Sequence, residues 1–475
     1  MICYNRVYMW WSIRAVFSGD WLAVFVAMDT ENGLLIMKLL IIQPSHYQSR
    51  SNGKLHKTRK RNLVGLTLPY LAALTPREWD VELIDQQLSN IDFKDSVDLV
   101  AITTWTLNSL AAYEIADRFR ARGIPVIMGG PHSYSFFEEM AQHCDAVGIG
   151  EGETIWGKML EDAASGRLQK FYRAEKPHHL RDLPFPRYDL LDFRQYTLIK
   201  TFAVQTSRGC PFRCDFCAER FYLGKDYRFR PVSDVIDEIK ESGGKYILFA
   251  DSTFAGKKKH TMELMEALIP LEVRWSALWS SNLCRNTEFM DLAKRSGLLH
   301  LNIGVESIDQ ITLAGMNKKA NRVKHYGEIL NNLRKRGISY SFNFVFGYDT
   351  EHDGIFDSTL AFLKQNKVPA AYFNILTPHK GTPLYDRMND EGRLIDPGNI
   401  SRWPGIICYI KPKQGTPQEL ERNVRRMYQE FYSLKSIFSR LPFPSSQSDL
   451  ASWVVNLSQR KISRGDEDLE NFENY

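Results

Sequence analysis

Three cysteines that lie close together in the chain have the types and the spacing that most clearly indicate chemistry. They occur in the segment Thr206-Ser-Arg-Gly-Cys210-Pro-Phe-Arg-Cys214-Asp-Phe-Cys217. Thiolates are soft ligands that suit iron–sulfur clusters, and a cubane cluster needs several of them from one short loop. No fourth cysteine stands in this segment. The spacing therefore predicts that Cys210, Cys214 and Cys217 hold a [4Fe-4S] cluster with one open iron, where substrate chemistry can occur.

A zinc site and a fully ligated cluster are the two alternatives for these cysteines. A zinc site more often uses paired Cys-x-x-Cys units, and no second half with cysteine or histidine follows nearby. A cluster in an iron–sulfur sensor or binding module, which is the non-enzyme alternative, normally has all its irons ligated by protein. The open iron argues against that alternative, and the sequence therefore favours an enzyme.

Two series of strands and helices must position the cysteines. In the first series, short apolar runs alternate with helical patterns, which is typical of a doubly wound parallel sheet. A second series of the same kind predicts a (β/α)6 partial barrel, in which the cysteine loop follows the first strand. The predicted strands are 39–42, 81–84, 99–103, 126–128 and 146–149 in the first series, and 203–206, 246–250, 273–277, 301–305, 341–346 and 372–376 in the second.

The α/β organisation divides the chain into an amino-terminal doubly wound, Rossmann-like domain over residues 37–166, a linker over 167–200 and a barrel core over 201–395. Residues 396–475 form a helical carboxyl-terminal region and tail. Residues 1–36 have no periodicity, and we interpret them as a start-site artefact or a disordered extension before a true start at Met37.

Composition excludes several classes of protein. The net charge of +5 is spread over 61 basic and 56 acidic residues, so no basic face for nucleic acid is expected. The apolar run 21–28 is too short to span a bilayer, which needs about 20 residues. Seven cysteines in 475 residues make no disulfide framework. We therefore expect a reducing, cytoplasmic location and at most peripheral membrane contact.

The cysteine segment, with Phe216 just before its last cysteine, resembles the signature of the radical S-adenosylmethionine (SAM) superfamily. The resemblance implies that the open iron binds the amino and carboxylate groups of SAM and that an electron from the cluster cleaves SAM to a 5′-deoxyadenosyl radical. Three later segments resemble strand-end motifs of the superfamily, and with them the resemblance assigns Phe216, Asp251, Glu306 and Gly347 to SAM binding. The segments are Phe249-Ala-Asp251, Gly304-Val-Glu306-Ser307 and Asn343-Phe-Val-Phe-Gly347.

The amino-terminal sheet followed by the barrel resembles the cobalamin-binding (class B) members of the superfamily, over about residues 37–435. Ligands of doubly wound sheets bind at the carboxyl ends of the strands. Three loops are expected there, and the resemblance assigns Thr104, Gly129, Gly130 and Gly150 in them to cobalamin. The loops are 103–106, Gly129-Gly-Pro-His132 and Gly148-Ile-Gly-Glu-Gly-Glu153.

One departure from the cobalamin-binding pattern concerns the cobalt. The Asp-x-His-x-x-Gly segment whose histidine would bind cobalt from below is absent from the sequence. The resemblance therefore implies cobalamin without a protein histidine ligand, and a sheet that binds no corrinoid is the alternative.

The two cofactors together imply transfer of a methyl group to an unactivated carbon. The stretch 376–394 is similar to bacteriochlorophyllide and hopanoid C-methyltransferases, which implies a large hydrophobic substrate. A bacteriochlorophyllide side chain, in bacteriochlorophyll biosynthesis, is the preferred substrate, and a hopanoid is the alternative. Oxidation or ring closure without methyl transfer stays open as another reaction class. A flavodoxin- or ferredoxin-type electron donor is expected, and no residue is assigned as general acid or base.

Overall fold

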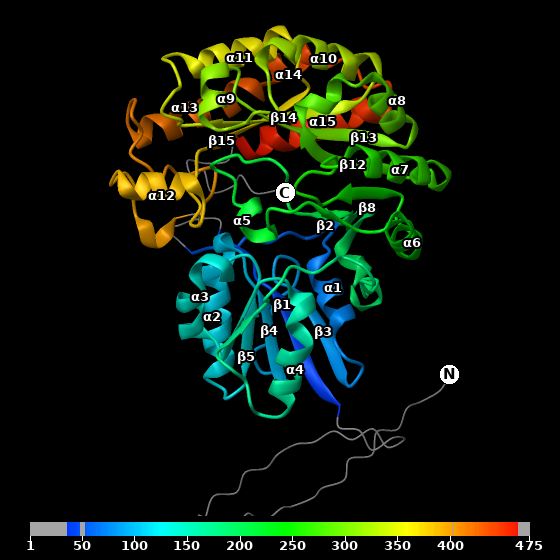
Figure 1. Cartoon of the computed structure of the whole chain (residues 1–475), viewed down its shortest axis with the longest axis vertical. Helices are drawn as coiled ribbons and strands as arrows, with labels where there is room; N and C mark the ends of the chain where they lie inside the picture. The colour runs from blue at the N-terminus through cyan, green and yellow to red at the C-terminus, as the bar shows by residue number, and fades with distance from the viewer. Residues whose placement is uncertain (1–35, 48–52, 401, 464–475) are drawn as a thin grey trace, which may run out of the picture.

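The computed structural model describes residues 36–47, 53–400 and 402–463. The prediction for residues 1–36 falls, except for its last residue, outside the described residues. Figure 1 shows two sheets, one above the other along the long axis of the molecule, with helix α5 (Glu219–Leu223) in the layer where the two halves meet. The predicted α/β architecture is confirmed, and the cysteine loop lies between the two halves.

The first sheet is parallel throughout, with the strand order β3-β1-β4-β5-β6-β7. Alternate residues of β1 point to opposite faces: Leu40 and Ile42 pack under α2 and α3, whereas Leu39 and Ile41 pack under α1 and α4. The strands are β1 (Met37–Gln43), β3 (Trp79–Asp85), β4 (Leu99–Thr103), β5 (Val126–Gly129), β6 (Ala146–Ile149) and β7 (Phe171–Arg173). The helices are α1 (Thr67–Leu74), α2 (Ser109–Arg120), α3 (Ser133–His143) and α4 (Trp156–Ala164).

The second sheet is also parallel, with the order β15-β14-β13-β12-β11-β8-β2, and its curved strands and outer helices form the predicted partial barrel. One large core of apolar and aromatic side chains lies between this sheet and its helices. The strands are β8 (Tyr196–Val204), β11 (Tyr246–Phe249), β12 (Arg274–Ser280), β13 (Leu298–Glu306), β14 (Ser339–Phe346) and β15 (Ala370–Ile375). The helices between them are α6 (Val232–Ser242), α7 (Lys258–Leu268), α8 (Thr287–Arg295), α9 (Gln310–Gly315), α10 (Tyr326–Lys335) and α11 (Ile355–Gln365).

Each of the two large sheets contains one short strand that was not predicted. β2 (Arg61–Val64) comes from the range assigned to the amino-terminal domain, yet it pairs parallel with β8 at the edge of the barrel sheet. β7 comes from the range assigned to the linker, yet it pairs with β6. Each has one buried side chain, Val64 in β2 and Tyr172 in β7. Segments with so little apolar pattern become strands through their neighbours, which sequence periodicity does not reveal.

The carboxyl-terminal region is helical, as predicted. Helix α13 (Pro417–Phe431) begins with a capping box between Thr416 and Glu419 and has Pro417 in its first turn. Its buried face packs on β15. The other helices of this region are α12 (Pro383–Asp390), α14 (Leu434–Arg440) and α15 (Gln447–Ser463). None of the described helices combines the length and hydropathy that crossing a membrane requires.

Candidate cluster and cofactor site

The cysteine loop begins directly after the short strand β9 (Ser207–Arg208). Gly209 has φ +85°, and a Cβ there would overlap the backbone carbonyl oxygen of Asp226, so the turn into the loop requires glycine. Cys210, Cys214 and Cys217 are free and half-buried. The loop thus presents all three thiols from one short turn, which matches the donor set of a cubane cluster.

Asp215, between the last two cysteines, anchors the loop to distant parts of the barrel. Its carboxylate accepts hydrogen bonds from the Tyr348 hydroxyl and from Nη1 of Arg387, the latter at 3.2 Å. The Asn317 amide also donates to the carbonyl oxygen of Arg213, at 2.6 Å. These anchors were not predicted, because their partners are far away in the sequence.

The three thiols are not arranged as ligands of a single metal ion. Among the described residues, no three histidine, cysteine or carboxylate groups are arranged to hold a single metal ion. Three cysteines that each ligate a different iron of one cluster need no such convergence. The loop therefore fits a cubane better than a single zinc ion.

A buried ion pair lies beside the cysteines. Nζ of Lys318 donates to Oε1 of Glu306 at 2.6 Å, and both side chains are almost fully buried. Burial alone would lower the pKa of Lys318, but the charges of Glu306 and Cys214 raise it above its usual value. A Cβ on Gly304 would lie 2.5 Å from the Glu306 carboxylate, so this glycine leaves room for the pair. The pair thus offers both charge signs that an amino acid ligand such as SAM requires.

Burial also affects the thiols. It raises the pKa of Cys214 to about 11 and that of Cys217 to about 12, while the charge of Lys318 acts in the opposite direction on Cys214. A metal ion deprotonates a thiol that coordinates it. Lys318 therefore adds a favourable charge next to the thiolates of a loaded cluster.

Asp251 and Gly347 are predicted SAM contacts, and both lie against other segments of the protein. The Asp251 carboxylate accepts from the backbone N–H groups of Thr206 and Ser207, at 2.7 and 3.0 Å, and from the Thr206 hydroxyl. It therefore fixes the approach to the cysteine loop. Gly347 has φ +108°, and a Cβ there would lie 2.9 Å from Leu420 of α13, so the helix covers this strand end closely. Phe216 packs against the barrel core.

The predicted cobalamin residues Thr104, Gly129 and Gly130 lie together at the carboxyl edge of the first sheet. The N–H of Thr104 donates to the Gly129 carbonyl oxygen at 2.8 Å. Gly130 has φ +102°, and a Cβ there would lie 2.7 Å from the backbone oxygen of Thr104. The buried hydroxyl of Thr104 has no hydrogen-bond partner among the described residues. The unsatisfied hydroxyl at this edge fits a site for a polar group of a ligand, and the absence of a Cβ at Gly130 lets the Thr104 backbone approach.

His132 of the same loop has both ring nitrogens occupied. Nε2 lies 2.8 Å from the Tyr113 hydroxyl and Nδ1 lies 3.1 Å from Oγ1 of Thr106. Burial, together with the charge of Arg402, lowers the pKa of His132 to about 3, so the ring is neutral. The side chain is therefore held by the protein and leaves no nitrogen free for cobalt.

The turn around Gly150 connects the first domain to the barrel through its two glutamates. A Cβ on Gly150 would lie 2.5 Å from the side chain of Ala174, so this glycine, at φ +107°, lets a strand of the same sheet approach. The next residues reach the barrel: Glu153 pairs with Arg208 at 2.6 Å, and Glu151 pairs with Arg228 at 2.6 Å. All four side chains are largely buried. Since Arg208 precedes the cysteine loop by one residue, these pairs join the first domain to the cluster site.

Aromatic side chains form a second link between the two halves. Tyr134, at the start of α3, has its ring centroid 6.0 Å from that of Phe221 and 5.5 Å from that of Tyr222. Both of these residues lie on α5, which follows Cys217 directly. We name Gly129–His132 the glycine loop, and we name Tyr134, Phe221 and Tyr222 the aromatic layer. The glycine loop and the cysteine loop therefore lie on the two sides of the aromatic layer.

We predict that Arg208→Met strongly destabilises the protein. The substitution leaves the buried Glu153 carboxylate without its cation, which typically costs about 3–5 kcal/mol of unfolding free energy. Arg194→Met is the matched control, because Arg194 pairs with Asp192 at the surface and is 91% exposed; its unfolding midpoint should equal that of the parent. Urea unfolding followed by circular dichroism measures both. Equal midpoints for all three proteins would mean that the Arg208–Glu153 pair contributes nothing.

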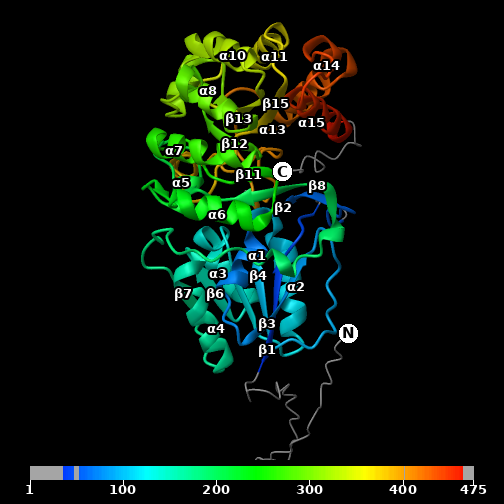
Figure 2. The same cartoon turned by 90° about the vertical axis from the view of Figure 1, so that its right-hand side faces the viewer.

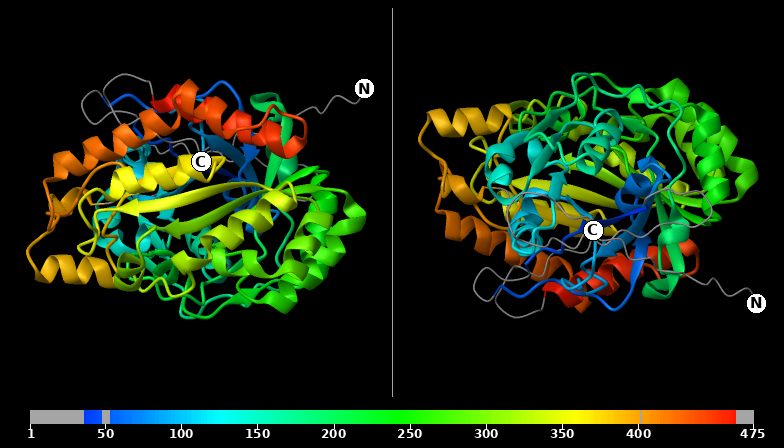
Figure 3. Two further views of the ribbon diagram at one scale, coloured as in Figure 1. Left: turned by 90° about the horizontal axis from the view of Figure 1, so that it is seen from above. Right: turned by 90° about the horizontal axis from the view of Figure 1, so that it is seen from below.

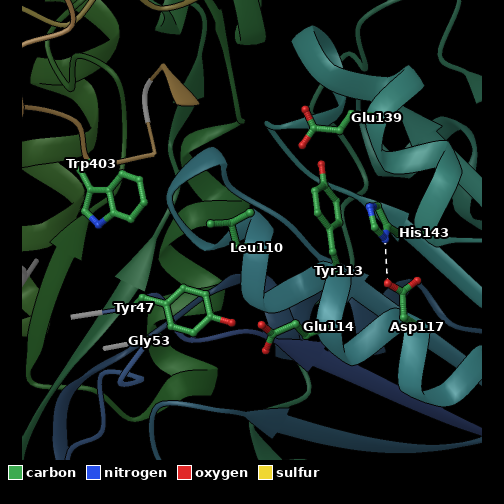
Figure 4. Close-up of a pocket in the computed structure, with 9 residues that line it drawn as sticks. All are labelled: Tyr47, Gly53, Leu110, Tyr113, Glu114, Asp117, Glu139, His143 and Trp403. Atoms are coloured by element: carbon green, nitrogen blue, oxygen red, sulfur yellow. Dashed lines mark hydrogen bonds and ion pairs between the residues drawn. The ribbon is translucent and has the colours of Figure 1, made fainter. Parts of the chain in front are cut away.

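A pocket of about 570 Å³ lies to one side of this site, between α2, α3 and the segment after α12 (Figure 4). Trp403 stands across the pocket from Leu110 and Tyr113, and Nδ1 of His143 lies 2.8 Å from Oδ2 of Asp117. The lining residues are Tyr47, Gly53, Leu110, Tyr113, Glu114, Asp117, Glu139, His143 and Trp403. No cysteine and no predicted cofactor contact is among them, so this pocket is separate from the cluster site.

Comparisons with known proteins agree with this geometry. Residues 204–363 match the family described as the radical SAM superfamily. The bacteriochlorophyllide d C-12(1)-methyltransferase of Chlorobaculum tepidum is 31% identical over 414 residues, which cover 84% of this chain and 88% of that protein. The chain belongs to the radical SAM superfamily. It is an enzyme of the methyltransferase group within that superfamily, and a [4Fe-4S] cluster and SAM are the cofactors that membership implies.

Two further comparisons extend the likeness. The hopanoid C-2 methylase of Rhodopseudomonas palustris is 24% identical over 393 residues, which cover 78% of this chain and 74% of that protein. Among solved structures, the radical SAM methyltransferase TsrM from Kitasatospora setae, with cobalamin and a [4Fe-4S] cluster bound, superposes with a TM-score of 0.60 at 18% identity, over 82% of this chain and 85% of that chain. The radical SAM enzyme described here therefore has the two-domain fold of a cobalamin-dependent enzyme.

Proposed function

We propose that this radical SAM enzyme uses cobalamin to methylate an unactivated carbon of a large hydrophobic molecule, a bacteriochlorophyllide side chain in bacteriochlorophyll biosynthesis. The observation that carries the proposal is the contact of Tyr134 with Phe221 and Tyr222. This contact joins the helix that follows the glycine loop to the helix that follows the cysteine loop. When bound, SAM on the cluster supplies the radical that removes a hydrogen atom from such a carbon, and cobalamin supplies the methyl group. A substrate between the two loops would meet both.

The chain's own residues would orient these molecules and exclude water. Glu306 and Lys318 would bind the amino and carboxylate groups of SAM, with Phe216 and Gly347 near the rest of the molecule. Asp251 would act indirectly, through Thr206. The aromatic layer would stack on a flat macrocycle and keep water from the reacting carbon.

Cobalamin would lie at the carboxyl edge of the first sheet, over Thr104, Gly129 and Gly130, with Gly150 shaping the neighbouring turn. The unpartnered hydroxyl of Thr104 supports this location. Because both nitrogens of His132 are occupied, the proposal includes no histidine ligand to cobalt.

Gly130→Ala is expected to reduce corrinoid retention by at least about tenfold, because a Cβ there would lie 2.7 Å from the backbone oxygen of Thr104 and would displace the loop; a similar loss follows when groups that orient a metal centre are removed. Gly157→Ala on α4, where a Cβ meets nothing within 4 Å, is the matched control. Absorbance of the bound corrinoid after gel filtration measures the effect. If both variants retain as much corrinoid as the parent, the cobalamin site lies elsewhere.

The proposal also covers the electron donor and the location of the enzyme in the cell. A flavodoxin- or ferredoxin-type protein would supply the electron, and the enzyme would act in the cytoplasm, where thiols stay reduced. Supply of electrons by a purified ferredoxin in place of dithionite tests the first of these.

Product mass distinguishes the reaction classes. Incubation of the reconstituted enzyme with a bacteriochlorophyllide should yield a product heavier by one CH2 group. Methylation of a hopanoid instead would redirect the substrate assignment, in line with the likeness to the hopanoid C-2 methylase. A product that has lost hydrogen or closed a ring without gaining carbon would replace methyl transfer by oxidation or cyclisation.

A further inference from the structure

Helix α15 has its polar side buried and its apolar side exposed. The buried hydroxyl of Ser452 lies 2.8 Å from that of Ser339 at the start of β14. The Asn456 amide donates to the carbonyl oxygen of Pro369 at 2.8 Å and its oxygen accepts from Nη2 of Arg440 at 3.0 Å. The buried residues of the helix are Ser448, Ser452, Asn456, Gln459 and Ser463. These specific hydrogen bonds, rather than apolar burial, fix which side of the helix faces the barrel.

The outer side of α15 continues onto α14 and the loop between them. Phe443 of that loop is 87% exposed, and Phe438 of α14 is 66% exposed. The ring of Phe438 contacts the edge of Trp453, with centroids 5.3 Å apart, and Nε1 of Trp453 donates to the carbonyl oxygen of Pro442 at 2.8 Å. We name this surface the outer apolar face, and it consists of Leu434, Phe438, Phe443, Leu450, Val454 and Leu457.

The face lies on the outside of the molecule. Figure 2 shows α14 and α15 on the opposite side of the barrel sheet from α7 and α8. Both views of Figure 3 show α15, coloured red, along one edge of the molecule. Single exposed apolar residues are common on soluble proteins, but a contiguous set on a helix whose polar side is buried marks an interaction surface.

Within residues 432–463, basic residues outnumber acidic ones. This range contains two lysines and two arginines, of which Arg440 is buried, and Asp449 is its one acidic residue. Its carboxylate accepts hydrogen bonds from the hydroxyls of Ser445 and Ser446, at 3.0 and 2.8 Å. Lys435 and Lys461 are exposed. An apolar surface of Phe, Trp, Leu and Val with lysines at its border has the chemistry of a helix that lies in the interface of an anionic bilayer.

We propose that the outer apolar face docks this enzyme on the surface of a membrane that contains anionic lipid. A second copy of the chain is the competing occupant. A two-fold contact would place the same patch against itself and bring the lysines of both copies together, whereas anionic headgroups complement them. None of these residues belongs to the cluster site, so the inference goes beyond the proposed function and does not depend on it.

Vesicle sedimentation of the full-length, reconstituted enzyme tests this inference. Parent enzyme should sediment with phosphatidylcholine vesicles that contain phosphatidylglycerol, and less with phosphatidylcholine alone. Phe438→Asp should lower the bound fraction at least tenfold. Ile311→Asp on α9 is the matched control, since Ile311 is 69% exposed and lies far from the face in sequence and on another helix. It should bind like the parent, and Lys435→Glu should weaken binding to the anionic vesicles.

Failure of the parent to sediment, or equal sedimentation of Phe438→Asp, would overturn the inference. So would a solution mass of two chains that Phe438→Asp reduces to one while vesicle binding is absent, because the face would then be a self-contact. Formation of 5′-deoxyadenosine without vesicles should be the same in all variants. A loss there would concern the cluster site and not the membrane face.

Discussion

Replacing Cys214 by alanine is expected to abolish formation of 5′-deoxyadenosine from SAM. The three cysteines stand alone in a loop that has no spare thiol, so the loss of one removes a direct iron ligand. Loss of groups that merely orient a metal ligand already costs about 10–100-fold in affinity or activity, and loss of a direct ligand should exceed that range. Iron and sulfide content, the EPR spectrum of the reduced protein and chromatography of deoxyadenosine give the measurement.

The control for Cys214 is Cys408→Ala. Cys408 is buried in the carboxyl-terminal region, about 190 residues from the cysteine loop in the sequence, and its thiol donates to the carbonyl oxygen of Ile410 at 3.2 Å. This variant should keep the cluster and the activity. Retention of the cluster and of deoxyadenosine in Cys214→Ala would contradict the assignment of the loop, and equal loss in both variants would show that the measurement reports folding.

The second large effect is expected at the buried pair of Glu306 and Lys318. Lys318→Met alone leaves a buried carboxylate uncompensated, which typically costs about 3–5 kcal/mol of unfolding free energy. The double variant Glu306→Gln/Lys318→Met removes both charges and should recover most of that stability. It should still bind SAM at least about thirtyfold more weakly than the parent, because loss of a buried charged contact costs about 2–5 kcal/mol of binding.

Urea unfolding and the change that SAM makes in the EPR spectrum of the cluster separate these two effects. The matched control is Lys364→Met/Glu430→Gln, which removes a pair at 3.2 Å whose side chains are both well exposed. It should change neither stability nor SAM binding by much, since exposed pairs contribute about 0–1 kcal/mol. If the Glu306→Gln/Lys318→Met protein binds SAM as tightly as the parent, the pair serves the fold alone.

Features that depend on neighbouring residues in the chain were predictable from the sequence. The apolar runs of β1, β4 and β14 are each buried in a sheet, and the ligand set of Cys210, Cys214 and Cys217 is local. The helical spacing of Leu420, Val424, Met427 and Phe431 indicates the face of α13 that is buried. In each case the period of the pattern determines which side chains share a face.

Features that depend on pairing between distant segments were not predictable. Nothing near Glu153 in the sequence indicates that it meets Arg208, and nothing near Asp215 indicates Tyr348 or Arg387. Lys318 was not predicted, because a single lysine in a polar turn is ordinary. The signal available was Glu306 in the Gly-Val-Glu-Ser segment, because a carboxylate that is buried at a strand end needs a cation as its partner. The turn at Gly150 illustrates the same limit, since nothing in its sequence indicates that Glu151 and Glu153 pair with arginines of the barrel.

Helix α15 shows that periodicity can also point to the wrong side. Its apolar residues Leu450, Val454 and Leu457 have helical spacing, which on its own predicts that they face the core. They are exposed, and the serines and Asn456 on the other side are buried. The hydrogen bonds to Ser339 and Pro369 that select this orientation come from segments more than eighty residues away.

The most direct test is anaerobic reconstitution of the full chain with iron, sulfide and hydroxocobalamin, followed by SAM, dithionite and a bacteriochlorophyllide. A radical SAM methyltransferase should form 5′-deoxyadenosine, retain corrinoid on the protein and yield a bacteriochlorophyllide heavier by one CH2 group. Deoxyadenosine without corrinoid and without a methylated product would contradict cobalamin-dependent methyl transfer, and the absence of deoxyadenosine from a protein with a full cluster would contradict the radical chemistry itself.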